Sequence, residues 1–497
     1  MQHRLSSVAR LPKALLAVSS LLAAGSPLPI GAAPARAATS GTVLQTNLVS
    51  DLPGAAAVTD PNLVNSWGIS ESGASPFWIS DNNAGLTTLY NVPGPSNTPV
   101  SVNPLAVNIP TPVSFTGGAP TGTVFNTSSG GFTITGPNKM KVTVTAPAVF
   151  LFATEDGTIV GWNPGIDPTG KFAGPNGFSE QAVVAKDNSG NNFTQPDPTM
   201  QTGAVYKGLA IATTTTPIVS GNGKSTALLY AANFRAGTID VYGTDLKPVS
   251  GLSAGAFTDP GLPAGYAPFN VQVLDGKLYV SYAVQNATRH DDLAGPHRGF
   301  VDVFNFDGSP GLPGKAVRLI SHGVLDSPWG LAIAPPGFAG LSAPGGDPVL
   351  LVGNFGDGLI HAFDATTPGP GVGQLTDPDG EPIRIDGLWA LKVGNGGMGG
   401  SSNTVYFTAG PFGESHGLFG SLATATPGSP EGTAESQWVQ ANADVVQRDA
   451  QQLVTDTSGG APVATIKQDN QTLATDTHAL VHAEEAFTDD TVSDSAP

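Results

Sequence analysis

Pro328-Trp329-Gly330-Leu331-Ala332 is one of six copies of a short pattern, in which a small or aromatic pair precedes a β-rich run. The other copies are Ser66-Trp67-Gly68-Ile69-Ser70, Pro120-Thr121-Gly122-Thr123-Val124, Tyr206-Lys207-Gly208-Leu209-Ala210, Pro268-Phe269-Asn270-Val271-Gln272 and Gly387-Leu388-Trp389-Ala390-Leu391. One residue of each copy is here called its pivot. The pivots are Gly68, Gly122, Gly208, Asn270, Gly330 and Ala390, which lie 54, 86, 62, 60 and 60 positions apart. A strand-rich repeat of this period is typical of propeller blades. The sequence therefore predicts an all-β fold, a six-bladed β-propeller.

Each pivot is followed by two further β-rich runs that a short polar turn connects. These pairs are 77–80 with 86–90, 150–152 with 158–162, 228–233 with 238–242, 278–282 with 300–304, 349–354 with 359–363, and 405–408 with 417–420. Val, Ile, Tyr, Phe and Thr dominate the runs, and residues of this kind favour strands. Each blade should thus hold an inner strand A, a hairpin of strands B and C, and an outer strand D, as at 316–320 and 381–385. Two insertions, 127–147 and 164–205, extend the connections of blade 2.

The sixth blade has no convincing strand D before the chain changes character near residue 423. Residues 42–48, ahead of the first pivot, alternate well enough to be a strand. We expect them to pair as strand D of blade 6, because this closes the ring and removes two open sheet edges.

The first 37 residues have the parts of a secretory signal peptide. Arg4, Arg10 and Lys13 accompany an apolar run, and Ala35-Arg36-Ala37 supplies a small-x-small cleavage pattern. The apolar run is too short for a membrane anchor, and no other stretch is long enough to cross a bilayer. The expected organisation is a signal peptide at 1–37, a propeller at 38–423 and a tail at 424–497, in a secreted protein without a membrane span.

The 497-residue chain is acidic, with a formal net charge of −18 that becomes −22 once the four basic residues of the signal peptide are removed. A strongly acidic protein repels phosphate backbones, so nucleic acid is not an expected partner. The chain has no cysteine, which excludes disulfides, thiolate catalysis and cysteine–metal sites. An exported propeller of this composition must be stabilised by sheet packing alone.

The tail at 424–497 contains twelve Asp and Glu residues against Arg448 and Lys467, and no copy of the pattern. Single apolar residues recur there every seven positions, from Val439 to Leu453 and from Ile466 to Phe487, without the second apolar position of a coiled coil. Two interpretations stay open: an acidic, partly helical or disordered tail in solvent, or helices that associate with a partner or with each other. The first predicts that the propeller folds without the tail.

Propeller topology determines where polar side chains can meet, because the B–C turns of all blades emerge on one face. The polar residues of these turns are Asp81, Asn82, Asn83, Glu155, Asp156, Asn233, Arg235, Asn354, Asp357, Glu414 and His416. Blade 4 has a much longer B–C loop, 285–298, which carries His290, Asp291, Asp292 and His297. A long loop over the axial opening is typical of a functional segment.

The candidate ligand-binding residues on this face are Asn82, Asn233, Arg235 and Asn354. Asp291, Asp292 and Asp357 are the candidate metal ligands, since Ca²⁺ or another divalent cation takes hard oxygen ligands. His290 beside Asp291 can act as a general base with an acidic partner, or bind a transition metal. The alternative is purely structural, because Asn, Asp and Gly are favoured in β-turns for backbone reasons.

Other sequence features give weaker signals. Trp67, Trp329 and Trp389 occupy equivalent positions in three blades, which favours packing between blades over a ligand platform. Asn270 is similar to the axial asparagine of metal-dependent lactonase propellers, but Gly or Ala fills the other five pivots, so the remaining ligand set is missing. Nucleophile elbows, Walker loops and His-Glu-x-x-His motifs are also absent from the sequence.

Several separated motifs, in the same order, are shared with one protein family. They are Asn65-Ser66-Trp67-Gly68, the run from Arg289 to Pro296, Gly299–Phe304, Ser327–Ala332, Val352–Gly358 and Asp386–Leu391. Over roughly residues 43–422 the chain resembles an uncharacterised family of secreted bacterial NHL-like β-propellers, some of whose members end in a PEP-CTERM sorting tail. The resemblance implies a propeller outside the cytoplasm and brings no activity or ligand set. The acidic tail lacks the hydrophobic span and basic end of a sorting signal, which favours release over anchoring.

Two functions follow from these observations. The first is a secreted binding or interaction scaffold that uses the B–C face to hold an extracellular protein, a glycan or a small molecule. The second is a propeller enzyme, either a lyase or a metal-assisted hydrolase of lactones or esters. Whether a divalent cation binds among the B–C turns distinguishes the metal-dependent possibilities from a plain scaffold.

Overall fold

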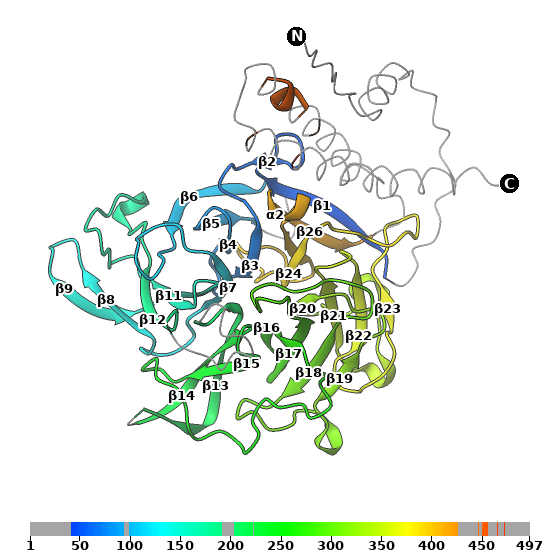
Figure 1. The fold of residues 1–497 in the computed structure, drawn as a ribbon. Helices are drawn as coiled ribbons and strands as arrows, with labels where there is room; N and C mark the ends of the chain where they lie inside the picture. The colour runs from blue at the N-terminus through cyan, green and yellow to red at the C-terminus, as the bar shows by residue number, and fades with distance from the viewer. Residues whose placement is uncertain are drawn as a thin grey trace, which may run out of the picture. The chain divides into compact units, whose positions relative to one another are not determined.

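The structure, a computed structural model, describes residues 41–93, 99–190, 203–221, 223–425, 446, 450–455, 465 and 472. The predicted signal peptide and most of the acidic tail lie outside the described residues. Six β-sheets surround a common axis in the described part, and each contains one copy of the sequence pattern (Figure 1). The prediction of an all-β, six-bladed propeller is confirmed. In the same part of the chain, no helix is long and apolar enough to cross a membrane.

The innermost strand of each blade begins at or close to the copy of the pattern. These strands are β3 (Ser66–Ser70), β7 (Pro120–Phe125), β13 (Tyr206–Ser220), β16 (Tyr266–Leu274), β20 (Pro328–Ile333) and β24 (Leu388–Val393). Each contacts the next around the axis, and β24 contacts β3, so the six inner strands form a closed ring.

The predicted B–C hairpins are also present in all six blades. They are β4 (Phe77–Asp81) with β5 (Leu86–Asn91), β10 (Phe150–Thr154) with β11 (Thr158–Trp162), β14 (Gly223–Asn233) with β15 (Thr238–Tyr242), β17 (Lys277–Val284) with β18 (Phe300–Phe304), β21 (Val349–Asn354) with β22 (Ile360–Asp364), and β25 (Val405–Ala409) with β26 (Leu418–Thr424). In the part of the chain that the structure describes, the connections contain the short 3-10 turns η2 (Pro175–Gly177), η3 (Pro313–Lys315), η4 (Phe338–Gly340) and η5 (Pro344–Gly346).

The outer strands vary more than the inner ones. They are β6 (Ser101–Asn108), β12 (Val183–Asp187), β19 (Arg318–Ser321) and β23 (Gly373–Gln374). The prediction of a strand at 381–385 was wrong. The outer strand that pairs with β22 is β23, earlier in the chain, and a turn at Asp377 follows it. Beyond this turn, Pro382 and Arg384 form only isolated bridges. The insertion at 127–147 forms its own hairpin, β8 (Thr133–Pro137) with β9 (Thr143–Pro147).

Residues near the start of the described chain close the ring. Strand β1 (Val43–Ser50) pairs antiparallel with β26, and β2 (Val58–Thr59) extends the same sheet from the other side of β1. The two ends of the propeller therefore share blade 6, as predicted from the alternation at 42–48. Val43, Leu48 and Val49 have no exposed surface, so this pairing also buries apolar side chains.

A β-bulge lies at the pattern in every inner strand. The register with strand B shifts between Ser66 and Ile69 in blade 1, and at the corresponding place in the other five blades. A bulge bends its strand and redirects the neighbouring side chains. The backbones of adjacent blades approach closely here, because a Cβ added to Gly122 would lie 2.4 Å from the Leu209 nitrogen. The pivots are therefore small where the next blade leaves no room.

Side chains of neighbouring blades satisfy backbone carbonyls near these bulges. Thr121 Oγ1 donates to the Tyr206 carbonyl at 2.9 Å, and Asn270 Nδ2 donates to the Trp329 carbonyl at 2.6 Å. Asn270 thus joins blades 4 and 5, which explains a pivot asparagine without a metal. Apolar clusters fill the space between the blades, as where Trp78 of blade 1 stacks on Phe150 of blade 2 at 4.2 Å.

Candidate functional site

The axis is closed by the residues that precede the pivots. Trp67, Thr121, Lys207, Phe269, Trp329 and Trp389 are all buried. The rings of Trp67 and Trp389 stack with centroids 3.5 Å apart, and Trp329 meets both edge-on at 6.2 and 5.9 Å. The tryptophans therefore pack across the axis, where they leave no exposed aromatic surface for a ligand. They form the floor of the B–C face.

Lys207 is the charged member of this ring, and its side chain is only 1% exposed. Its ammonium pairs with Glu155 Oε1, lies 3.5 Å from Asp291 Oδ1, and sits 4.8 Å from the centroid of the Trp67 ring. Burial alone would lower the pKa of Lys207, but the Glu155 and Asp291 carboxylates together raise it. The lysine is therefore a charged ammonium on the propeller axis.

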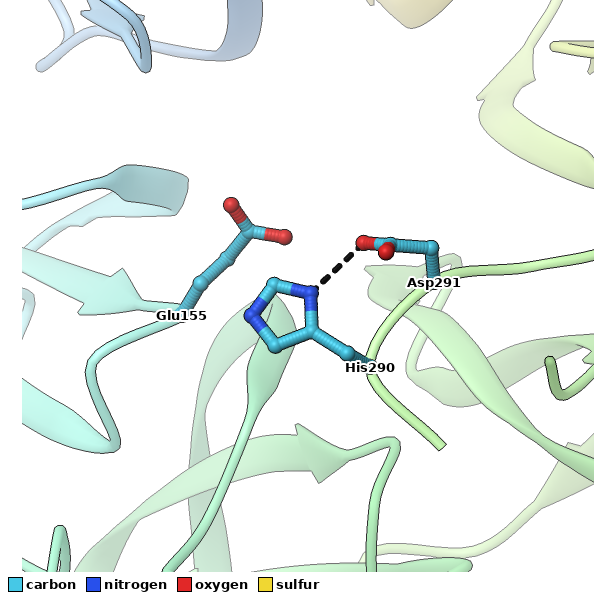
Figure 2. Close-up of side chains that lie close together, drawn as sticks. All are labelled: Glu155, His290 and Asp291. Atoms are coloured by element: carbon cyan, nitrogen blue, oxygen red, sulfur yellow. Dashed lines mark hydrogen bonds and ion pairs between the residues drawn. The ribbon is translucent and has the colours of Figure 1, made fainter. Parts of the chain in front are cut away.

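The long B–C loop of blade 4 brings His290 and Asp291 to this ammonium. His290 Nδ1 lies 2.6 Å from Asp291 Oδ1 (Figure 2). Asn286 supports the pair, because its Oδ1 accepts the backbone N–H of His290 at 3.1 Å. The hydrogen bond from His290 holds the pKa of Asp291 down at about 2, with Lys207 contributing. The His290 side chain is 33% exposed and its ring faces Glu155, so it lies at the site and not in bulk solvent.

The B–C turns of blades 1 and 2 complete this side of the cluster. Asn82 Nδ2 donates to Glu155 Oε2 at 3.0 Å and to the Pro120 carbonyl at 3.3 Å. Glu155 is therefore fixed between a carboxamide of blade 1 and the ammonium of blade 3. Its side chain is 12% exposed, so both contacts are largely shielded from solvent.

Glu414 reaches the same group from blade 6. It ends the single turn α2 (Pro411–Glu414), in which Phe412, Gly413 and Glu414 all have φ between 58° and 70°. Burial raises the pKa of Glu414 to about 6, against a hydrogen bond from Asn65 Nδ2 at 2.8 Å and the attraction of Lys207. A backbone in this left-handed region is strained, and such strain is concentrated at functional sites.

The other predicted residues have different surroundings. Burial raises the pKa of Asp292, which lies close enough to Lys207 for their charges to interact. Burial lowers the pKa of Arg235 against the attraction of the Asp291 carboxylate, and Arg235 Nη1 donates to the Gly203 carbonyl at 3.3 Å. Asn233 and Asp357 accept backbone N–H groups of their own turns, and Asn354 Nδ2 donates to the Val324 carbonyl. The N–H bonds that Asn233 and Asp357 accept are those of turn residues. Asn233 Nδ2 also donates to Asp240 Oδ2, and the Asn354 bond joins strand β21 to the segment that precedes β20.

The structure thus brings together His290, Asp291 and Asn82, with Asp292 and Arg235 nearby. Glu155 and Glu414 complete the group; the sequence places them in B–C turns but gives no reason to prefer them. Lys207 was not predicted as a site residue. A signal for it exists, because Lys207 is the one charged residue among the six that precede a pivot.

Glu155, His290 and Asp291 can together hold a metal ion. One ligand atom from each lies within 4.8 Å of the others (Figure 2). Two carboxylate oxygens and an imidazole nitrogen suit Mn²⁺ or Zn²⁺, and the oxygens also suit Ca²⁺. Of the three predicted metal ligands, Asp291 is a member of this triad. The triad residues come from blades 2 and 4.

No protein-family model matches the chain. Two relatives come from Acanthamoeba polyphaga mimivirus. The uncharacterized protein R648 is 30% identical over 381 residues, which cover 76% of this chain and 78% of that protein. The uncharacterized protein L690 is 30% identical over 380 residues, which cover 76% of this chain and 84% of that protein.

Among solved structures, the chain is similar to virginiamycin B lyase from Staphylococcus aureus, with 11% identity, a TM-score of 0.34, and coverage of 77% of this chain and 99% of that chain. It is also similar to an α-L-arabinofuranosidase of Fusarium graminearum, with 9% identity, a TM-score of 0.36, and coverage of 77% and 98%. The chain belongs to the family of the mimivirus proteins R648 and L690.

Proposed function

We propose that this protein is a binding module whose B–C face holds a divalent metal ion between Glu155, His290 and Asp291, and with it a polar ligand. One observation carries the proposal: ligand atoms of these three residues, from two blades, lie within 4.8 Å of one another. Asn82, Arg235 and Asp292 around the triad supply further polar groups for the ligand. A small polar molecule fits these groups better than a large apolar partner does.

The charge of the site supports a cationic occupant. Glu155, Asp291, Asp292 and Glu414 interact with one ammonium, that of Lys207. Crowded carboxylates repel one another unless positive charge relieves them, more strongly at Glu155, which is 12% exposed, than at Asp291, whose side chain is 57% exposed. The excess of acid over base around Lys207 leaves room for further positive charge.

The proposed setting is outside the cytoplasm. The signal peptide predicted at 1–37 and the resemblance to secreted bacterial NHL-like propellers both support export. The net charge of −18 opposes nucleic acid as a partner. The ligand would then be an extracellular small molecule, a glycan or an exposed group of another protein.

Calorimetric titration of the chain with Ca²⁺, Mn²⁺ and Zn²⁺ tests the proposal. We expect one ion to bind the wild type with one site per chain, and the Asp291→Asn variant to lose that binding. Asp275→Asn is the matched control, because Asp275 is an exposed acid in the A–B turn of blade 4, on the opposite face. Binding that survives Asp291→Asn, or no binding by the wild type, would contradict the proposal.

A second candidate function is enzymatic, as a lyase or a metal-assisted hydrolase of lactones or esters. One observation favours it: the site holds one carboxyl with a pKa of about 2, Asp291, and one with a pKa of about 6, Glu414. Carboxyls separated in this way can act as base and acid at one pH. A panel of chromogenic esters and lactones tests this function, with Glu414→Gln and His290→Asn expected to lower any turnover.

A further inference from the structure

We infer that Lys207 is the built-in cation of this site, and that its ammonium competes with a divalent ion for the same carboxylate oxygens. The inference rests on the proposed function and adds its regulation. In the structure the ammonium pairs with Glu155 Oε1 and lies 3.5 Å from Asp291 Oδ1. A metal ion bound by Glu155 and Asp291 would have to take over these contacts. Metal binding and the Lys207–Glu155 ion pair therefore exclude each other.

Lys207 has no direct route into solvent, because its side chain is only 1% exposed. A divalent ion a few ångströms away would repel it strongly, because charges interact more strongly in a shielded site than in water. The side chain must then move toward other acceptors, and Asp292 and Glu414 are the acids near enough to interact with it.

Lys207 is the one charged residue in the ring of residues before the pivots. Its counterparts are Trp67, Thr121, Phe269, Trp329 and Trp389, all buried and uncharged. Thr121 fills the equivalent place in blade 2 with a short side chain and no exposed surface. The fold therefore accepts a neutral residue at the equivalent position of another blade. We attribute the charge of Lys207 to the carboxylates of the site.

The test compares wild type, Lys207→Met and Lys207→Arg in calorimetric titrations with MnCl₂ and CaCl₂. Methionine reproduces the lysine side chain as far as Cε and removes the ammonium, so we expect affinity to rise by about tenfold or more. Arginine keeps the charge and should bind the ion no more tightly than wild type. The melting temperature of Lys207→Met should also rise more on adding the ion than that of wild type.

The outcomes separate this inference from the proposed function. If the wild type binds and Lys207→Met binds equally or more weakly, the inference is wrong while the proposed function stands. If only Lys207→Met binds, competition by the ammonium is supported, while the proposed function, which requires the wild type to bind, is wrong. If neither protein binds either ion, both are wrong.

Removing Lys207 leaves shielded carboxylates without their partner, which can prevent folding. Two further variants guard against this. Lys207→Thr copies the residue that blade 2 uses, and Lys207→Met with Glu414→Gln removes one negative charge while keeping the metal triad. A variant that folds only when the ion is present supports the inference. A variant that folds without the ion and ignores it overturns the inference.

Discussion

Where the B–C face meets the propeller axis, Lys207 offsets the repulsion among four carboxyl groups. Glu155 and Asp291 contact its ammonium directly, and Asp292 and Glu414 interact with it through their charges. A buried ammonium needs such partners, since an unpaired buried charge is strongly destabilising. The hydrogen bond from His290 lowers the pKa of Asp291, whereas burial raises the pKa values of Asp292 and Glu414.

Replacing Glu414 by glutamine should change how stability depends on pH. Burial raises the pKa of Glu414 from 4.5 to about 6, so this group favours folding below pH 4.5 and loses that contribution as the pH rises to 6. Glutamine keeps an acceptor for Asn65 and does not titrate. The stability of wild type relative to Glu414→Gln should therefore fall by on the order of 1 kcal/mol between pH 4.5 and 6. Chemical denaturation of both proteins at several pH values measures this difference in the free energy of unfolding. A difference that stays constant or rises with pH would contradict the account.

Adding a methyl group at a pivot should destabilise the ring of inner strands. A Cβ on Gly122 would lie 2.4 Å from the Leu209 nitrogen, which is backbone and cannot turn aside. We expect Gly122→Ala to lower the free energy of unfolding by about 1–3 kcal/mol. Gly73→Ala is the matched control, because no heavy atom lies within 4 Å of its added Cβ. Equal stability of the two variants would show that the blades do not approach as described.

The sequence predicts the members of the site unevenly. His290, Asp291 and Asn82 could be identified because they lie in B–C turns, and the topology brings those turns together. Lys207 was not predicted as a site residue because it lies in an inner strand, where a bulge directs its side chain to the axis. Asp357 lies in a B–C turn as predicted, but its carboxylate accepts the Leu359 N–H of that turn. Which turn residue faces the axis depends on backbone geometry that the sequence pattern does not contain.

The strands were predicted with similar unevenness. Inner strands and B–C hairpins follow from the repeated pattern, because their faces are buried between blades and strongly apolar. The outer strands are short and lie at an edge, so few residues determine them. In blade 5 we predicted the outer strand at 381–385. The observed strand is β23, whose two residues, Gly373 and Gln374, have low strand propensity.

Strand β1 is the element on which ring closure depends. A chain that begins at residue 51 lacks β1 and exposes the free edge of β26 together with the surface that Val43, Leu48 and Val49 cover. The lost burial amounts to about 5 kcal/mol, which is comparable to the whole stability of many domains. We expect this chain to aggregate or melt far below one that begins at residue 41. Equal melting temperatures and elution volumes would show that closure does not need β1.

For the molecule as a whole, the propeller is complete at β26, which ends at Thr424. Truncation after Pro427 keeps every strand and removes a segment with twelve acids and two bases. The melting temperature should stay within about 5 °C of the full chain, since a charged segment of this kind buries little apolar surface. Truncation after residue 417, which removes β26, is the control and should not fold. A large loss after Pro427 would mean that tail residues such as the buried Val446 support the propeller.

The central claim is that the propeller brings Glu155 of blade 2 together with His290 and Asp291 of blade 4 as a metal site on the B–C face. Anomalous diffraction from crystals of the full chain soaked in MnCl₂ tests it most directly, because it locates the ion without relying on activity. The account predicts one strong peak in contact with Glu155, His290 and Asp291, with the Lys207 ammonium displaced from Glu155. A peak elsewhere on the propeller, or no peak at saturating Mn²⁺, would contradict the proposed site.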